Sequence, residues 1–479
     1  MTDGILFACP AKRLFPYRMI FHEKCLTRFA AILCLGTIAA CHAADWPRFG
    51  GPNGTGVSLE TNLARVWPAE GPRVLWTVDV GEGFAGAAIR DGEVYLLDRV
   101  PDTQDVLRCL DLASGHELWK VACDAPGGLP NNGSRNVPTV DEQYLFTVGP
   151  FGHFRCIDRK THQVLWNKHL VNDFKDSQID ISQAPTNRAD TLRRAQVPMW
   201  GMTQAPLLHR DMVIVAPQTQ KTGMVAYEKA TGKIRWRSEY IGRNWYSHVS
   251  PYLATLCGVD QVIMLAQPSD PEKSPDDAPP SNITSIDPNT GAILWKTQTP
   301  RPHKIPIPQP LQIGEDRLFI SGGFKLGSII YQVTHTADRW KVKIAAQNQI
   351  VTPHIQSPAF YKGRIYITSF KEHGATQTGL VCMGLDGQPL WQTGPGLQFD
   401  AGGYILADDL AFVMHGKTGV LYMLGLSDGG AQVLGKARML EAKHGNVWAP
   451  LALSDGKLIV RDQYQMKCLD VRNPGAPSR

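Results

Sequence analysis

The chain has 479 residues, of which 43% are hydrophobic and 19% charged, and it carries a formal net charge of +5. Five cations and two acidic residues lie in the first 44 residues, so the rest of the chain carries about +2, which gives no electrostatic basis for nucleic-acid binding. The length would suffice for three ordinary domains, but the repeats described below account for it as one.

The N-terminal segment, residues 1–43, has the pattern of a secretory signal peptide. Lys24 and Arg28 precede an apolar run from Phe29 to Ala40, which is too short to span a bilayer and is followed by small residues. We therefore expect a periplasmic or other extracytoplasmic location.

Two outcomes of signal processing stay open. Ile38-Ala39-Ala40-Cys41 resembles a lipobox, in which the signal ends at residue 40 and Cys41 is lipidated, so that the protein is anchored to the outer membrane. Cleavage after Ala43 would instead release a soluble protein. A leader segment, residues 44–61, follows in both cases and is rich in Gly and Pro ("DWPRFGGPNGTGVS").

From residue 62 to residue 471 the chain consists of repeats with two halves. One half is a strand, a tight turn and a strand with a large apolar residue, which is Trp or Leu at positions 76, 119, 166, 236, 295, 340, 391 and 434. The other half is a small or Pro residue, a polar turn and a β-branched or aromatic run, and it also occurs eight times, from "GAAIRDGEVYLLD" to "APLALSDGKLIVRD". Repeats of this period predict a β-propeller, because one small sheet cannot bury both of its faces alone.

Both counts predict an all-β, eight-bladed propeller of four-stranded antiparallel blades. One repeat is split, since "CLDV" at 468–471 has no strand after it and "PRVLWTV" at 72–78 has none before it. The N-terminal strand should therefore complete the last blade, which leaves no open edge in the ring. Residues 472–479 are expected to form a C-terminal tail.

The repeated Trp residues are expected to wedge between neighbouring blades, where each indole can bury a large apolar area. Gly115 and Gly232 stand at turns that need positive φ, whereas His162 occupies this place in the second blade and should strain its turn. Cys109, Cys156, Cys382 and Cys468 share one repeat position, which predicts small buried residues and no disulfides between blades.

Asp287, Thr290, Gly291 and Trp295 form a pattern of an Asp, a Thr-Gly turn and a Trp, and Thr231, Gly232 and Trp236 repeat most of it. With this pattern the repeats resemble those of the pyrroloquinoline-quinone (PQQ)-like propeller family, in which it is the tryptophan-docking motif. The resemblance covers nearly all of residues 62–471 and implies the propeller fold. It leaves function open, because the family includes quinoprotein dehydrogenases and also cofactor-free propellers that resemble outer-membrane protein assembly factors.

One face of the propeller should carry the function. The loops that lead from the fourth strand of one blade into the first strand of the next, here called entry loops, open onto this face together with the loops between second and third strands. Seven His fall there, at positions 153, 248, 303, 354, 373, 415 and 444, with Arg and Lys at 99, 135, 243, 304, 325, 371, 417 and 461. We take the following as candidate ligand residues: Arg135, Trp200, Trp245, His248, Lys304, His354, Lys371, His415 and Trp448.

This face is interpreted as a basic, His-rich surface for a protein partner or for an anionic or carbohydrate ligand. An ordinary solvated loop surface is the alternative, and no His pair has the spacing of a metal site. The insertions 171–203 and 267–282 enter blades 3 and 4; the first should fold over this face, and the second is acidic and Pro-rich.

Catalysis by bound PQQ with calcium would need features that the sequence does not display. Adjacent cysteines are absent, as is a CxxCH haem motif, so no cofactor is expected. Asp400 is the best candidate for a base, with Glu82 and Glu372 behind it, and His354 and His444 are further catalytic candidates, yet none stands in a matching motif.

The sequence therefore favours an exported, monomeric, non-catalytic scaffold for binding or assembly. A periplasmic PQQ-dependent alcohol or sugar dehydrogenase is the first alternative. A hydrolase or lyase acting on acidic polysaccharide, in which His and Arg neutralise a carboxylate and move a proton, is the second.

Overall fold

The computed structural model describes residues 45–129, 131, 133–174, 197–219, 221–243, 248–268, 279–324, 326–337, 339–369 and 379–474. All of these belong to one compact unit, Ala43–Arg479. The other unit, Met1–His42, lies outside the described residues, as do the predicted signal peptide, Cys41 and most of both insertions. No helix that could cross a membrane occurs in the described part of the chain.

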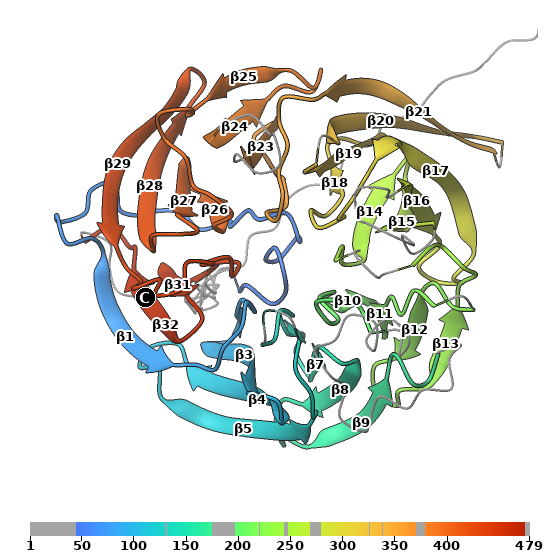
Figure 1. The fold of residues 1–479 in the computed structure, drawn as a ribbon, viewed down its shortest axis with the longest axis horizontal. Helices are drawn as coiled ribbons and strands as arrows, with labels where there is room; N and C mark the ends of the chain where they lie inside the picture. The colour runs from blue at the N-terminus through green and yellow to red at the C-terminus, as the bar shows by residue number, and fades with distance from the viewer. Residues whose placement is uncertain are drawn as a thin grey trace, which may run out of the picture. The chain divides into compact units, whose positions relative to one another are not determined.

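The described residues form 32 strands in eight four-stranded antiparallel sheets, which are arranged as the blades of a ring (Figure 1). This confirms the predicted eight-bladed propeller. Its apolar core lies mainly between neighbouring blades, and one buried cluster joins residues such as Ile89 of blade 1, Ile459 of blade 8 and Phe412 of blade 7.

The first four blades follow one another along the chain. Blade 1 contains β2 (Ala88–Arg90), β3 (Glu93–Val100), β4 (Gln104–Asp111) and β5 (Glu117–Asp124). Blade 2 contains β6 (Thr139–Val140), β7 (Tyr144–Val148), β8 (His153–Asp158) and β9 (Val164–His169). Blade 3 contains β10 (Leu207–His209), β11 (Met212–Val215), β12 (Val225–Glu228) and β13 (Ile234–Arg237). Blade 4 contains β14 (Tyr252–Leu256), β15 (Val259–Ala266), β16 (Pro280–Ile286) and β17 (Ile293–Pro302).

The next three blades continue in the same order. Blade 5 contains β18 (Leu311–Gln312), β19 (Arg317–Gly322), β20 (Gly327–Thr336) and β21 (Arg339–Asn348). Blade 6 contains β22 (Ala359–Tyr361), β23 (Arg364–Ser369), β24 (Gly379–Met383) and β25 (Pro389–Gln392). Blade 7 contains β26 (Tyr404–Ala407), β27 (Leu410–Met414), β28 (Val420–Ser427) and β29 (Gly430–Arg438).

Blade 8 joins the two ends of the propeller. It contains β30 (Ala452–Ser454), β31 (Lys457–Arg461) and β32 (Gln465–Asp470), and its fourth strand is β1 (Arg73–Asp79). Strand β1 runs antiparallel to β32 with Trp76 opposite Cys468. The closure predicted from the split repeat is confirmed.

Several of the repeated indoles dock on the following blade, as predicted. Trp236 of blade 3 is 7% exposed and donates from Nε1 to the carbonyl of Pro288 in blade 4 at 2.9 Å. Its ring lies over Gly291, where an added Cβ would stand 2.5 Å from Cε3. Trp76 and Trp166 are held in the same way, and in blade 2 His162 adopts φ of +61° and stacks on Trp119 at 4.5 Å.

Two repeat positions differ from the prediction. In blade 5, Trp340 lies opposite His335 near the end of the β20–β21 hairpin, and Ala346 occupies the docking position opposite Ile330. In blade 7 a bulge leaves Leu434 without an opposing residue and places Gly435 opposite Met423. A bulge and a longer hairpin each change the number of residues between the turn and the docking position. The spacing of residues in the sequence alone does not reveal such a change.

The repeated cysteines are buried, as predicted. Cys109, Cys156, Cys382 and Cys468 are all free thiols, and so are the partly exposed Cys123 and Cys257. Burial raises the pKa of the four buried thiols, which keeps them protonated and unreactive.

The leader crosses the centre of the ring (blue in Figure 1). Trp46 exchanges backbone hydrogen bonds with Ile89 of blade 1, and Ser58 donates to the carbonyl of Leu406 of blade 7 at 2.8 Å. Glu60 accepts a hydrogen bond from the backbone N–H of Gly456 of blade 8 at 2.6 Å. These partners lie within or just after first strands, so the leader lies across the channel at the level of these strands.

Candidate functional site

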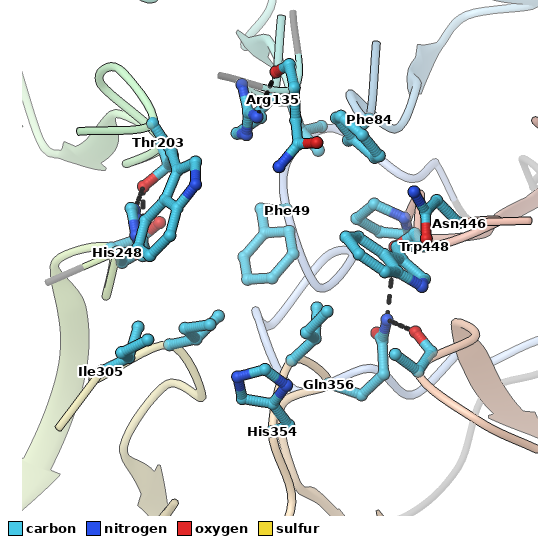
Figure 2. A pocket seen from close by; sticks show the side chains of 18 of the residues that line it. Phe49, Phe84, Arg135, Thr203, His248, Ile305, His354, Gln356, Asn446 and Trp448 are labelled. Atoms are coloured by element: carbon cyan, nitrogen blue, oxygen red, sulfur yellow. Dashed lines mark hydrogen bonds between the residues drawn. The ribbon is translucent and has the colours of Figure 1, made fainter. Parts of the chain in front are cut away.

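The entry loops surround a cavity of about 600 Å³, here called the funnel (Figure 2). Its volume lies within the range of small-molecule sites. Its apolar and aromatic lining consists of Phe49, Phe84, Val137, Trp200, Ala205, Ile305, Ile307, Phe324, Ile355, Ala401, Trp448 and Pro450. Its polar lining consists of Asn131, Arg135, Thr203, His248, Ser250, His354, Gln356, Asp400, Lys417 and Asn446.

The leader supplies one wall of the funnel. Phe49 belongs to the leader, and Figure 2 shows its ring in the middle of the surrounding side chains. Trp46, 2% exposed, anchors this segment and packs on Gly51, where a Cβ would meet the indole at 2.7 Å. Because the leader lies across the channel at the level of the first strands, it borders the funnel together with the entry loops.

One side of the funnel is a stack of three flat groups. Phe84 lies between β1 and β2, Arg135 between β5 and β6, and Trp448 between β29 and β30. The Phe84 and Trp448 rings stack at 5.5 Å with an angle of 24° between their planes. The guanidinium carbon of Arg135 lies 4.9 Å from the centre of the Phe84 ring, within cation–π range.

Arg135 has backbone partners and no carboxylate within ion-pair distance among the described residues. It donates from Nη1 to the carbonyl of Gly133 at 3.1 Å and from Nη2 to that of Asn131 at 2.5 Å. Burial lowers the pKa of Arg135 to about 10, and the charge of Glu82 opposes this only in part. Arg135 is therefore a charged group at neutral pH in a poorly solvated place.

His248 lines the funnel on another side, beside Trp200. Its Nδ1 lies 2.8 Å from Oγ1 of Thr203, and its ring lies 5.3 Å from that of Trp200. Burial lowers the pKa of His248 to about 3, with smaller contributions from Arg135 and His354. His248 is therefore neutral at neutral pH and adds hydrogen-bonding capacity without adding charge.

Asp400 is engaged in an ion pair at the edge of the funnel. Its Oδ2 lies 2.8 Å from Nζ of Lys417, whose side chain is 70% exposed. Nearby, Gln356 donates from Nε2 to the carbonyls of Ala401 at 2.9 Å and Trp448 at 3.3 Å, which ties the entry loops of three blades together (Figure 2). Lys417 thus compensates the negative charge that Asp400 brings to the funnel.

The structure brings together seven of the residues that the sequence singled out. These are Arg135, Trp200, His248, His354, Asp400, Lys417 and Trp448. Lys304 lies behind this lining, with Nζ 5.0 Å from the Phe324 ring, and His444 instead packs edge-on against Tyr464. His415 stands just outside and accepts a hydrogen bond from the backbone of Lys417. Trp245, Lys371, Glu372, Lys325 and His373 lie outside the described residues.

Other predicted face cations hold the entry loops instead of lining the funnel. Arg99, at the end of β3, donates from Nη2 to the carbonyls of Ala125 at 2.8 Å and Gly127 at 2.7 Å. Arg461, at the end of β31, donates to the carbonyl of Gly81 at 2.9 Å. Both side chains are buried, so they satisfy loop carbonyls that would otherwise lack partners.

His303 was also placed on this face, and the structure buries it completely beneath an entry loop. Burial lowers the pKa of His303 to about 3. His248 and His303 therefore supply no positive charge to this face at neutral pH, because desolvation keeps both of them neutral.

Sequence reasoning missed much of the apolar lining. Phe84, Ile305 and Ile307 lie in entry loops and Phe324 in the loop between β19 and β20, and their positions beside Pro and Gly were a usable signal. Phe49 had no such signal, because the leader lies outside the repeats and its path cannot be counted from them.

The funnel residues do not fit a calcium-bound PQQ site. Calcium takes six to eight oxygen ligands, mostly carboxylates and carbonyls. Asp400 is the one carboxylate in the described lining, and Lys417 neutralises it. No cluster of three or more His, Cys, Asp or Glu suited to a metal ion occurs in the described residues.

Comparison with known proteins identifies relatives of the repeats. The family model described as "Outer membrane protein assembly factor BamB" matches residues 102–354 and 195–433, which together span well over half of the chain. No curated protein sequence matches the chain.

Solved structures with the same fold include BamB and dehydrogenases. BamB from Moraxella catarrhalis superposes with a TM-score of 0.53 at 13% identity, covering 83% of this chain and 99% of that one. A europium-containing methanol dehydrogenase gives 0.60 at 12% identity, covering 88% of each chain. A quinohemoprotein alcohol dehydrogenase from Comamonas testosteroni gives 0.59 at 12% identity, covering 91% of this chain and 82% of that one. Identities this low establish a shared fold and nothing about activity.

Proposed function

The chain belongs to the PQQ-like propeller family described as outer membrane protein assembly factor BamB, and from this premise we propose that it is a non-catalytic binding scaffold whose ligand occupies the funnel. The observation that carries the proposal is the largely apolar cavity, to which five Phe and Trp rings contribute. Flat rings from the leader and from several entry loops converge on it, as in sites that enclose an apolar ligand.

The polar groups of the funnel favour binding over chemistry. A general base works best with a pKa near the operating pH, whereas His248 titrates at about 3. The carboxylate of Asp400 is occupied by Lys417. These groups are well placed to orient a ligand and poorly placed to accept a proton from one.

The cellular setting that we propose follows from the N-terminal sequence and the family. The signal-like segment 1–43 supports export to the periplasm or another extracytoplasmic space, and Cys41 supports a lipid anchor in the outer membrane. We propose domains at 44–61 for the leader, 62–471 for the propeller and 472–479 for the tail. A monomer that presents its entry-loop face to a protein partner fits the family description.

Calorimetric titration of the purified protein with 2-naphthol, a flat and neutral probe, tests the proposal. We expect saturable binding of one equivalent, weakened about tenfold or more by Trp448→Ala, because a buried ring contact is lost. Trp391→Ala, on outer strand β25, is the matched control and should leave the affinity unchanged. Failure to bind both 2-naphthol and its anionic counterpart 2-naphthoate, or equal losses in the two variants, would refute a funnel ligand.

The dehydrogenase alternative is tested in the same protein. We expect no stoichiometric, calcium-dependent binding of PQQ and no alcohol-dependent reduction of an electron-accepting dye, because the lining lacks a suitable set of calcium ligands. A one-to-one complex that forms only with calcium and oxidises alcohols would replace the scaffold proposal.

A further inference from the structure

We propose that the funnel selects a planar aromatic monoanion, whose anionic group binds Arg135 while its ring lies along the stack of Phe84 and Trp448. This inference rests on the proposed function and adds the chemical class of the ligand. It concerns a small molecule or a terminal group with one flat ring system and one negative charge.

Arg135 has hydrogen-bonding capacity left for such a ligand. A guanidinium has five N–H donors, and two of them reach the carbonyls of Gly133 and Asn131. The other donors have no protein acceptor among the described residues. A carboxylate can take up two such donors at once in the planar geometry that arginine favours.

The surroundings of Arg135 make an anion favourable there. The guanidinium lies against the Phe84 ring in a lining made mostly of apolar groups, and Figure 2 shows Arg135 and Phe84 next to each other beside Phe49. A poorly solvated cation that no carboxylate contacts directly is costly, and the lowered pKa of Arg135 reflects this cost, which the charge of Glu82 offsets only in part. A bound anion offsets it, whereas a neutral ligand would remove the remaining water and leave the charge uncompensated.

The ring of the ligand is expected beside the same arginine. Phe84 and Trp448 present a stacked pair directly next to the guanidinium, and the opposite side holds Trp200 and the neutral His248. Aromatic rings gain from offset stacking and edge contacts as well as from area burial. A flat ring that bears its charge at one edge fits this arrangement, because the flat wall and the cation adjoin.

The number of charges in the funnel favours one negative charge over several. The described lining carries two permanent cations, Arg135 and Lys417, and Asp400 neutralises the second. His248 adds no charge at neutral pH. PQQ carries three carboxylates, so at least two of them would enter without a cation, and the funnel should discriminate against it.

The test compares 2-naphthoate with 2-naphthol by calorimetric titration of the full protein. We expect naphthoate to bind the unmodified protein about tenfold or more tightly than naphthol, since hydrogen bonds to charged groups are the stronger ones. Arg135→Gln should remove this preference, and naphthol should bind this variant at least as tightly as the unmodified protein, because no uncompensated charge remains. Lys341→Gln, which removes an exposed cation on outer strand β21, is the matched control and should change neither affinity.

Each result bears on a separate step. Naphthol binding by the Arg135→Gln protein shows that its funnel is folded, and equal naphthol and naphthoate affinities in the unmodified protein would overturn the anion inference alone. Failure of both probes to bind would overturn the proposed function itself. PQQ binding more tightly than naphthoate, with or without calcium, would also overturn the choice of a monoanion.

Discussion

A methyl group at Gly291 should destabilise the protein far more than one at Gly258, although both glycines lie in turns of blade 4 with nearly equal φ of +76° and +75°. The left-handed backbone alone costs Ala about 1 kcal/mol at each site. At Gly258 an added Cβ meets no atom within 4 Å, whereas at Gly291 it stands 2.5 Å from Cε3 of Trp236. Overpacking against a buried ring adds about 2 kcal/mol, so Gly291→Ala should cost about 3 kcal/mol and Gly258→Ala about 1 kcal/mol.

The difference can be assigned to the indole by a double-mutant cycle. Trp236→Ala alone should cost about 4 kcal/mol, because a buried ring and its hydrogen bond to Pro288 are lost. In that background the methyl at residue 291 has nothing to strike, so its cost should fall to that measured at residue 258. Urea unfolding followed by far-UV circular dichroism gives the free energies of unfolding. Equal costs for the two glycines in the unmodified protein would refute the docking of Trp236 on blade 4.

Three further predictions concern other parts of the molecule. Burial lowers the pKa of His303 from 6.5 to about 3, so between these pH values the unfolded chain binds a proton at His303 and the folded protein does not. The free energy of unfolding is therefore unaffected by His303 above pH 6.5 and falls as the pH is lowered from 6.5 towards 3. Between pH 7 and pH 5 the unmodified protein should therefore lose about 2 kcal/mol more than His303→Gln, and parallel urea-derived pH profiles would contradict this. In protein that starts at Asp45, a thiol reagent should modify Cys123 and Cys257 in the native state and all six cysteines in urea, as counted by mass spectrometry; rapid native labelling of Cys109 would show that its site is open. Trp46→Ala should lower the free energy of unfolding by about 3 kcal/mol, because the indole fixes the leader at its 2% exposed position, and an unchanged urea midpoint would mean that the leader does not stabilise the ring.

Much of the fold could be predicted from the sequence because a propeller repeats one four-stranded unit, so that each blade leaves a similar pattern of residues. The split repeat predicted that the strand carrying Trp76 completes the last blade, and Trp236 docks as expected. Trp340 and Leu434 were misplaced, because a long hairpin and a bulge alter the register without altering the residue types.

The funnel was predictable only in part, since topology assigns a residue to a face and not to a cavity. Arg135, His248 and Trp448 line the funnel. Arg99 lies on the same face, but its guanidinium donates hydrogen bonds to carbonyls of an entry loop. Charge was the least predictable property. Whether a histidine is a cation depends on its desolvation, which sequence does not reveal.

The pairing of β1 with β32 has a consequence for the order of folding. Its partners are nearly four hundred residues apart, as in the ion pair between Arg73 and Asp470. Strand β1 is synthesised early, and its edge therefore stays unpaired until the residues of β32 have been synthesised. Such distant contacts form slowly, and an unpaired strand invites association with other chains. Closure of the ring by pairing of β1 with β32 is thus a late step of folding. Any factor that shields residues 73–79 during synthesis should raise the yield of native protein.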